Sequence, residues 1–426
     1  MIVLLLGSGG REHALAWAIK KSPRLEKLYA APGSDAIAEL AERVPLDPLD
    51  GKAVAEFCAK AGVSLVVIGP EAPLAAGVAD VLRAAGVSVF GPGKAAAQLE
   101  SSKAFAKDFM RRHRIPTARF ATFTDAAKAK AALPEFGLPV VVKADGLAAG
   151  KGVRVCATLA EAQTALDDFM SRGALGEAGR RVVLEEALSG PEASWLGFCD
   201  GKNFLPLPPS QDHKRLKDGD LGPNTGGMGV FAPTPTVTPA VVKRIRAEIA
   251  DQVLIGLAKD GLDFRGLLYI GLMLTRDGPK VIEFNARFGD PETQAVLPLL
   301  QEDVLSLLEK TAEGKLKSRA PRWKGASVCV VLASEGYPDK PATGRAISGL
   351  DDPALSQALV FHAGTKKEGN VWKTAGGRVL GITAVGETLE DARAKAYAAA
   401  DKIRFEGLQL RRDICGQAAA PAGSRA

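Results

Sequence analysis

The chain has 426 residues, which is enough for about three domains of ordinary size. Apolar residues make up 46% and charged residues 24%, so the composition is that of a globular protein with hydrophobic cores and excludes a largely disordered chain. The net charge of +6 is mild for this length, and no run of five Lys or Arg residues occurs, which argues against nucleic-acid binding.

In the first hundred residues, buried strands alternate with helices, and each strand ends in a glycine-containing turn. Apolar runs cover residues 2–6, 65–68 and 87–90, and a helix is predicted over 11–20. This alternation is typical of an open parallel α/β sheet, which binds ligands beyond the carboxyl ends of its strands. We therefore predict an N-terminal α/β domain over residues 1–100, with its glycine turns along one edge.

The rest of the chain divides into a long middle part and a smaller last part. Residues 101–322 are predicted to form one domain with a glycine-rich flap subdomain at about 120–190, and residues 323–415 a small α+β domain. The tail 416–426 is rich in Ala and Gly, and we expect it to be disordered. Predicted helices cover 102–113, 238–259 and 389–404, and predicted strands cover 139–143, 153–156, 182–186, 266–275, 280–285, 327–332 and 377–384. The fold class is thus multidomain α/β and α+β.

The five cysteines are far apart, and no Cys-x-x-Cys pair occurs. This spacing predicts neither a zinc site nor a disulfide framework, and free thiols indicate a reducing compartment. The apolar run 2–6 is too short for a signal peptide, and no segment approaches the roughly 20 apolar residues that span a bilayer. We expect a cytoplasmic protein without a membrane partner.

The first glycine turn, Gly7-Ser8-Gly9-Gly10-Arg11-Glu12, resembles a dinucleotide fingerprint but has Glu12 where that fingerprint needs glycine. Backbone N–H groups at a helix N-terminus, with Arg11 beside them, suit a phosphate. The alternative is a plain strand–helix turn. We favour phosphate binding, because a second turn, Gly69-Pro70-Glu71, is expected to lie close by.

A glycine-rich loop follows the strand that ends at Lys143. It contains Gly146, Gly150, Lys151 and Gly152, and another strand follows it. This is not a Walker loop, whose Gly-Lys-Ser/Thr must open a helix. We interpret it as a flap that closes over a triphosphate, with Lys143 at the α- and β-phosphates. A hairpin with solvated lysines is less favoured, because Lys143 interrupts an apolar strand.

The strand 182–186 ends in Glu185-Glu186 and runs on through Leu188 to Glu192. A chain that leaves a sheet edge here offers backbone groups to an adenine, and Glu192 is placed to reach ribose hydroxyls. Paired glutamates are more often a solvated face, so this pattern alone is unspecific.

The segment VIEFNARFGDPE, residues 281–292, concentrates charge at the end of a strand. Side-chain alternation places Glu283 and Asn285 on one face with Val281, and Ile282 and Phe284 on the core face. Two oxygen ligands at i and i+2 suit a hard cation that keeps waters and bridges phosphates. Arg287 follows, and then Asp290; one guanidinium beside an oxygen-ligand pair is what an anionic substrate requires. A structural salt-bridge cluster is the alternative.

The polar segment 210–229 is a long loop, and such loops are often functional. His213 within it is a candidate general base, but a histidine in a polar loop is more often simply solvated. We do not assign it a catalytic role.

Taken together, these segments resemble the phosphoribosylamine–glycine ligase (glycinamide ribonucleotide synthetase) family of the ATP-grasp superfamily. The matching stretches are GSGGREHALAW at 7–17, VIGPEAPL at 67–74, GPGKAAAQLESSKAFAKDFM at 91–110, KADGLAAGKGV at 143–153, SQDHKR at 210–215, GPNTGGMG at 222–229, VIEFNARFGDPET at 281–293, HAGT at 362–365 and GGRVL at 376–380. They span the chain up to about residue 416. Ala286 departs from the Cys or Val frequent in the family, between the functional positions.

The resemblance implies a fold with a pre-ATP-grasp domain, an ATP-grasp domain and a small C-terminal domain. It implies that glycine, 5-phosphoribosylamine and ATP give glycinamide ribonucleotide, ADP and phosphate through glycyl phosphate, in purine biosynthesis. It places Mg²⁺ or Mn²⁺ on Glu283 and Asn285, and glycine near Arg287, Asp290 and, less firmly, Asp212. The ATP residues it implies are Lys103, Lys143, Gly146, Gly150, Lys151, Gly152, Glu185, Glu186, Leu188 and Glu192. The sugar-phosphate residues are Gly9, Gly10, Arg11, Glu12, Gly69, Pro70 and Glu71. We expect a monomer.

Two alternatives belong to other classes. A sister ATP-grasp ligase for another carboxylate would share the flap and the metal strand but need not carry GSGGREHALAW or GPNTGGMG. A nucleotide-binding regulatory module would need no metal-ligand pair, so Glu283, Asn285 and Arg287 argue against it.

Overall fold

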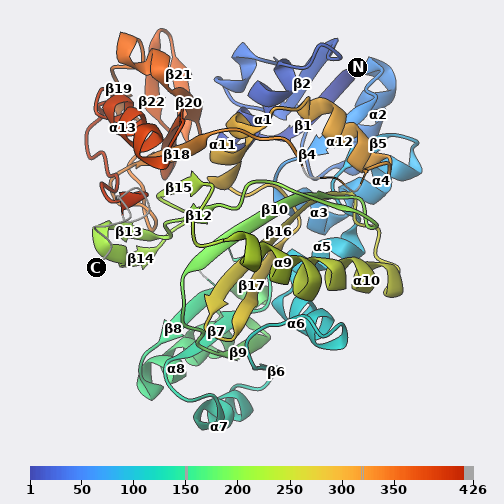
Figure 1. Ribbon diagram of the computed structural model, residues 1–426, viewed down its shortest axis with the longest axis vertical. Coiled ribbons are helices and arrows are strands. Elements are labelled where there is room, and N and C mark those ends of the chain that lie inside the picture. Colours follow the sequence, from blue (N-terminus) through green and yellow to red (C-terminus); the bar gives the residue numbers. More distant parts are fainter. Residues whose placement is uncertain (149–151, 318, 320, 417–426) are drawn as a thin grey trace.

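The computed structural model describes residues 1–148, 152–317, 319 and 321–416 (Figure 1). The predicted flap residues Gly150 and Lys151, and the tail from residue 417, lie outside the described residues. No helix in the described part combines the length and the apolar character needed to cross a membrane.

The N-terminal part is an open sheet of five parallel strands in the order β3-β2-β1-β4-β5. The strands are β1 (Ile2–Gly7), β2 (Lys27–Pro32), β3 (Glu42–Arg43), β4 (Leu65–Ile68) and β5 (Ser88–Phe90), and the helices are α1 (Gly10–Lys20), α2 (Gly51–Ala61), α3 (Glu71–Ala76), α4 (Val78–Ala84) and α5 (Lys94–Ser101). Because β1, β4 and β5 are parallel neighbours, the turns that follow them lie along one edge, as predicted.

The flap part is a four-stranded antiparallel sheet with its own apolar core. Its order is β6 (Phe120–Phe123), β9 (Val182–Glu186), β7 (Val140–Ala144) and β8 (Val153–Cys156), with helices α7 (Ala126–Phe136) and α8 (Leu159–Leu166). Figure 1 shows it at the bottom of the molecule, away from the N-terminal sheet. The glycine-rich loop joins β7 to β8 at the end where Lys143 lies.

A second antiparallel sheet forms the centre of the molecule. Its order is β11 (Phe204–Pro206), β10 (Glu192–Cys199), β16 (Gly266–Thr275) and β17 (Gly278–Asn285). The helices α6 (Lys103–Arg112), α9 (Pro239–Ile245) and α10 (Asp251–Lys259) contribute to its core, and a π-helical turn at Arg246–Ala250 joins the last two. Helix α12 (Val304–Ala312) packs between this sheet and the N-terminal one, so the two share one core.

Strand β17 departs from the predicted alternation. Gly271 pairs with Glu283, whereas its neighbour Leu272 pairs with Val281, so Ile282 is the extra residue of a β-bulge. Val281 and Phe284 therefore both lie in the core, and Ile282 does not. The prediction that Val281 shares the face of Glu283 is wrong, because a bulge resets the alternation.

The C-terminal part is built on a sheet that also takes two strands from the middle of the chain. Its order is β12 (Gln211–Asp212), β15 (Gly229–Ala232), β18 (Ala326–Ala333), β23 (Arg378–Gly386) and β20 (Leu359–His362), covered by α13 (Leu389–Ala400). A small sheet of β19 (Ala346–Ile347), β22 (Val371–Thr374) and β21 (Thr365–Glu368) lies beside it. The hairpin β13 (Arg215–Lys217) and β14 (Leu221–Asn224) connects β12 to β15, and α11 (Glu292–Val296) follows the predicted charged segment.

Candidate functional site

The predicted charged centre lies where the flap sheet meets the central sheet. The Lys143 ammonium, on β7, donates to the carbonyl oxygen of Ile282 in β17 at 3.2 Å. Beyond the bulge, Glu283 and Asn285 are two residues apart in regularly paired strand, so their side chains leave the same face. Both are partly exposed, so this face is open to a ligand.

Glu283 faces a group of cations. Its Oε1 lies 3.9 Å from the Lys214 ammonium, which in turn lies 3.1 Å from Glu192 Oε2. Burial raises the pKa of Glu283, but Lys214, Lys143 and Lys103 outweigh burial and leave this pKa below its ordinary value. The carboxylate is therefore ionised at neutral pH, which is the form that binds a hard cation.

Glu283 and Asn285 fit a divalent ion of the magnesium type. A carboxylate and an amide oxygen are hard ligands, and Mg²⁺ is usually held by one or two carboxylates together with waters and substrate phosphates. Within the described ranges, no group of three or more His, Cys, Asp and Glu side chains is arranged to hold a metal ion. The pair thus suits an ion that keeps several non-protein ligands.

Glu185, at the end of β9, lies between two lysines. Its Oε2 accepts a hydrogen bond from Lys107 Nζ at 2.7 Å, and its Oε1 lies 2.9 Å from Lys143 Nζ. Lys107 is 2% exposed and also donates to Thr117 Oγ1 at 2.8 Å. Burial lowers the pKa of Lys107 to about 8; burial raises the pKa of Glu185, but the two ammonium groups outweigh it. Lys107 was not predicted as a site residue. The one feature of the sequence that could have indicated it is its position one helical turn after Lys103.

The base of the flap loop is held by short contacts. Lys103 Nζ donates to the Gly146 carbonyl oxygen at 3.1 Å, and the Ala144 amide donates to the Gly152 carbonyl oxygen at 2.8 Å. Burial lowers the pKa of Lys103, and the nearby Glu283 opposes that change. Lys103 and the two ends of the predicted flap are therefore brought to the same junction as Glu283.

The other residues predicted to bind adenosine lie in different places. Glu192 begins β10 and pairs with Lys214, on the Glu283 side. Leu188 is partly buried just beyond β9. Glu186 instead accepts a hydrogen bond from the Arg119 amide at 2.9 Å, so its carboxylate is turned toward the segment before β6.

Asp212 belongs to a group of carboxylates around Lys214. Burial raises the pKa of Asp212 to about 7, with Glu292 adding to the rise and Lys214 opposing it. The Tyr269 hydroxyl donates to Glu292 Oε1 at 3.1 Å and lies 2.7 Å from Ser194 Oγ. Burial also raises the pKa of Glu292. Lys214 therefore supplies the positive charge that this acidic group needs.

Arg287 joins the N-terminal part to this centre. Its Nη2 lies 2.9 Å from Glu100 Oε1, and its Nε lies 3.4 Å from Glu71 Oε2. Burial works against the charged guanidinium, but Glu100 and Glu71 outweigh it and raise the pKa of Arg287. Arg287 and Arg11 both donate to the Phe288 carbonyl oxygen, at 3.1 and 3.2 Å. Glu71, predicted for the sugar phosphate, is thus a partner of Arg287.

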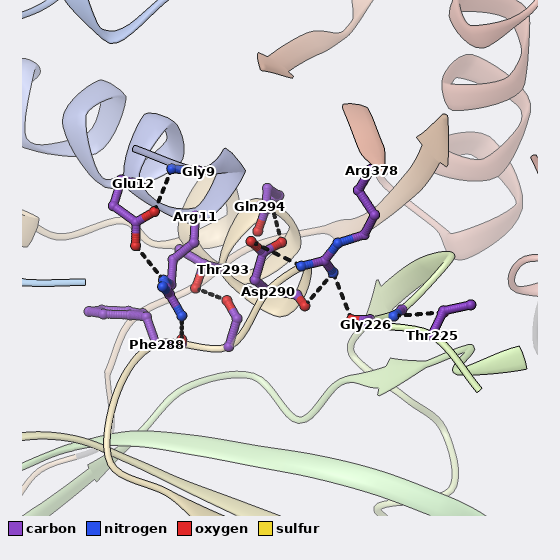
Figure 2. Close-up of polar contacts among 12 residues, drawn as sticks. Gly9, Arg11, Glu12, Thr225, Gly226, Phe288, Asp290, Thr293, Gln294 and Arg378 are labelled. Atoms are coloured by element: carbon purple, nitrogen blue, oxygen red, sulfur yellow. Dashed lines mark hydrogen bonds and ion pairs between the residues drawn. The ribbon is translucent and has the colours of Figure 1, made fainter. Parts of the chain in front are cut away.

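The two glycine turns of the N-terminal sheet meet at Glu12, as Figure 2 shows for the first of them. Glu12 is buried; its Oε2 accepts from the Gly9 amide at 2.7 Å and its Oε1 from Arg11 Nε at 2.5 Å. A Cβ atom on Gly69 would lie 2.2 Å from Glu12 Oε1, so this close approach requires glycine. Gly10 faces Gln294, because a Cβ there would lie 2.8 Å from Gln294 Nε2.

Asp290 is held by a residue of the C-terminal part, Arg378 (Figure 2). Arg378 Nη2 lies 3.3 Å from Asp290 Oδ2, and Nη1 donates to the carbonyl oxygens of Asp290 at 2.7 Å and Gly226 at 2.6 Å. Gln294 Nε2 donates to Asp290 Oδ1 at 2.8 Å. Burial raises the pKa of Asp290, but Arg378 and Arg11 outweigh burial and lower it. Sequence reasoning quoted Arg378 in a motif without giving it a role.

His213 is not simply solvated, so that interpretation is wrong. Its Nε2 accepts a hydrogen bond from the Cys415 amide at 3.2 Å. Burial lowers the pKa of His213 to about 4, so the ring is neutral and serves as a structural acceptor.

Models of one protein family match three consecutive stretches of the chain. They describe phosphoribosylglycinamide synthetase: its N domain over residues 1–100, its ATP-grasp (A) domain over 101–293 and its C domain over 327–417.

Individual proteins are similar over nearly the whole length. A phosphoribosylamine–glycine ligase of Mesorhizobium japonicum is 51% identical over 421 residues, which are 99% of both chains. The crystal structure of phosphoribosylamine–glycine ligase from Thermotoga maritima is 38% identical, covers 97% of this chain and 100% of its own, and has a TM-score of 0.86. The biotin carboxylase domain of 2-oxoglutarate carboxylase from Hydrogenobacter thermophilus, in complex with MgADP, is similar in fold alone, at 17% identity, a TM-score of 0.75, and coverage of 96% and 91%.

Proposed function

The chain belongs to the phosphoribosylglycinamide synthetase family, and we propose that it works through a glycyl phosphate intermediate. Its reaction is the ATP-dependent ligation of glycine to 5-phosphoribosylamine in purine biosynthesis, with a divalent metal ion. A carboxylate is a poor acyl donor. Transfer of the γ-phosphoryl group to a carboxylate oxygen of glycine releases ADP and creates a leaving group. The amine nitrogen then attacks the acyl carbon, and phosphate departs with that oxygen and with the proton that the amine loses.

One observation carries this proposal, namely the cations that surround Glu283. Lys214, Lys143, Lys103 and Arg287 all act on its carboxylate. In phosphoryl transfer the protein contributes mainly position and charge neutralisation, since no protein nucleophile is needed. A cluster of cations at the junction of flap and central sheet supplies both for the phosphoryl group between ATP and glycine.

We assign the ATP contacts to residues of the flap and of strand β9. Lys143 and Lys103 hold phosphates together with Gly146 and Gly152 of the flap loop, and Glu185, Leu188 and Glu192 take the adenosine. Two contacts support this assignment. Lys143 donates to Ile282 in β17, the strand that carries Glu283 and Asn285, and Lys103 donates to Gly146 of the flap loop. Both lysines therefore lie next to Glu283.

Glycine is assigned to Arg287 and Asp290. A guanidinium suits its carboxylate, and an ionised aspartate suits its ammonium. The lowered pKa of Asp290 supports this role, because the carboxylate stays charged at neutral pH. Asp212 is a weaker candidate, since its pKa of about 7 leaves it partly protonated. The turns at 9–12 and 69–71 take the sugar phosphate.

Glu283 and Asn285 would hold Mg²⁺ or Mn²⁺, whose chemistry when bound is to neutralise charge on the phosphate oxygens. The deprotonated Glu283 supplies an anionic ligand whatever the choice of metal.

Two measurements test the proposal. ADP release should require glycine, and ADP release at the same rate without glycine would contradict the proposal. Glycine labelled with ¹⁸O in its carboxylate should transfer one ¹⁸O atom to the released phosphate; its absence from that phosphate would exclude glycyl phosphate. A sister ligase for another carboxylate would release ADP with that acid in place of glycine.

We also propose that the protein is a cytoplasmic monomer. Its five cysteines are free and buried, which suits a reducing compartment. Sedimentation at several concentrations would test the monomer.

A further inference from the structure

Residues 411–415 lie against the loop that carries Lys214. We name residues 411–415 the C-terminal segment and residues 213–229 the site loop. Nearly two hundred residues of sequence separate them, yet several hydrogen bonds connect them. Figure 1 shows the β13–β14 hairpin at the side of the C-terminal part, away from the N-terminal sheet.

Arg411 is the centre of this contact. Its side chain is 1% exposed, although arginine is rarely buried without partners. Its Nε and Nη2 donate to the two oxygens of Asp413 at 2.7 and 2.6 Å, which is a bidentate pair. Its Nη1 donates to Asp220 Oδ1 at 2.7 Å and to the Arg215 carbonyl oxygen at 3.2 Å. One guanidinium therefore fixes both the start and the tip of the hairpin.

The other residues of the C-terminal segment also contact the site loop. Asp413 Oδ2 accepts from the Gly219 amide at 2.8 Å, and the Arg412 amide donates to Asp218 Oδ1 at 2.7 Å. Ile414 lies against the end of the site loop, because a Cβ on Gly229 would be 2.7 Å from its Cδ1.

The site loop has little else to hold its outer part. Residues 221–224 are exposed, and Leu221 is 64% exposed and belongs to none of the hydrophobic clusters of the described residues. A two-stranded hairpin is marginal by itself in water. Asp220 at its tip has φ of 54°, a left-handed conformation that costs free energy unless its surroundings hold it. The bond from Arg411 is such a restraint.

Both ends of the site loop belong to the functional site. At one end, Lys214 reaches Glu192 and Glu283. At the other end, the Gly226 carbonyl oxygen accepts from Arg378, the partner of Asp290. The Thr225 amide donates to the Lys214 carbonyl oxygen at 2.7 Å and ties the two ends together.

We propose that the C-terminal segment is a positioning device for the active site, in which Arg411 fixes the site loop and thereby places Lys214 beside Glu283. Arg411 acts through the loop and touches no substrate. The inference rests on the proposed function, since it gives Lys214 a place next to the reacting phosphoryl group. Of the assigned ATP contacts, Lys143, Glu185 and Lys103 lie on β7, β9 and α6, and Glu192, on β10, is the one that pairs with Lys214.

Arg411→Met tests this directly, with Asp220→Asn as a milder variant on the loop side and Arg412→Met as the matched control. The Arg412 side chain pairs with Asp401, and its backbone amide is retained in the variant. We expect Arg411→Met to lower kcat at least about tenfold, as the loss of charge-assisted hydrogen bonds implies, with KM for ATP changed less than about twofold. Asp220→Asn should show the same pattern with a smaller loss, and Arg412→Met should match the wild type.

Hydrogen exchange supplies a readout that does not depend on activity. Amides of residues 213–226 should exchange faster in Arg411→Met, while those of β1 and β16 keep the wild-type rate. Unchanged exchange over 213–226, or faster exchange throughout the chain with KM for ATP rising in step, would overturn the proposal. If Arg411→Met does not fold, the Asp220→Asn variant decides the matter: a wild-type kcat for that variant would by itself overturn the proposal. Absence of ¹⁸O transfer in the wild type would defeat the glycyl phosphate mechanism and leave the exchange result to decide the positioning role.

Discussion

Replacing Arg378 by Met removes the cation that keeps Asp290 ionised. Nη2 of Arg378 lies 3.3 Å from Asp290 Oδ2. At an effective dielectric constant of about 20, a pair at this distance interacts by about 5 kcal/mol, which is an upper bound. Gln294 and Arg11 stay in place, so we expect the pKa of Asp290 to rise, but by less than the full interaction with Arg378 implies.

The sign follows from the two opposing effects on Asp290. Burial raises its pKa, and Arg378 is the largest influence that lowers it. Without Arg378 the carboxylate takes up a proton at a higher pH, so the acid limb of the pH–rate profile moves upward. The variant should therefore lose its activity at a pH where the wild type is still active.

The assay is the initial rate of ADP release with both substrates, measured across the acid limb. Arg378→Lys keeps the charge and should shift the limb less, while losing one of the two carbonyl contacts and with it part of kcat. Arg345→Met removes an exposed charge of the same part of the chain, paired with Glu406, and serves as the control. An acid limb that stays at its wild-type pH in folded Arg378→Met would refute the reasoning.

Three further predictions concern other parts of the structure. Glu283→Ala should reduce both turnover and Mn²⁺ affinity at least about a hundredfold, with the affinity measured by electron paramagnetic resonance. The midpoint of thermal unfolding should stay unchanged. Near-normal activity at saturating Mg²⁺ would place the metal elsewhere. Lys107→Met should raise KM for ATP about tenfold with KM for glycine unchanged, since charge-assisted hydrogen bonds are lost only on the nucleotide side, and an equal rise in both would contradict this. Burial lowers the pKa of His13 and His213 to about 4 and of His362 to about 3, so the unfolded chain binds protons that the fold does not. Unfolding free energy from urea titrations should therefore fall as pH drops from about 6.5 to about 4, by up to about 1.4 kcal/mol per pH unit for each histidine, and His362→Asn should reduce that slope.

Four predicted strands have the bounds of the structure; three of them are mostly buried, and the fourth, 153–156 (β8), is largely exposed. The runs 65–68, 182–186 and 266–275 became β4, β9 and β16 with the predicted bounds, because continuous apolar residues stop there at Gly, Pro or a charge. The prediction from side-chain alternation is wrong in β17, where the extra residue Ile282 places the Val281 side chain in the core. A bulge is fixed by the neighbouring strand, which a local pattern does not describe.

The candidate site could be predicted in its types of residue but not in its pairings. Glu283, Asn285 and Asp290 stand out because oxygen ligands follow a strand end. Lys107 and Arg378 do not, since their partners lie 78 and 88 residues away. The same holds for β12 and β15, which sequence order assigns to the middle domain but which pair into the C-terminal sheet.

These distant pairings explain how the site can be strongly charged before any substrate binds. Arg287 lies with Glu71 and Glu100, Arg378 with Asp290, and Lys214 with Glu192. An anionic substrate that draws a cation toward itself would leave a buried carboxylate without a partner, which costs several kcal/mol.

Glu185 avoids that cost because it has two lysines. Lys143 is 6% exposed at the end of the flap strand, and Lys107 is fully enclosed and fixed by Thr117. If Lys143 turns toward the triphosphate, Lys107 still neutralises Glu185. We therefore expect the double variant Lys107→Met/Glu185→Gln, whose amide keeps an oxygen for the adenosine, to bind ATP better than Lys107→Met alone, because it removes the negative charge that would otherwise hold Lys143 away from the phosphates. Weaker ATP binding by the double variant would show that the nucleotide needs the charge of Glu185 and not only its oxygen.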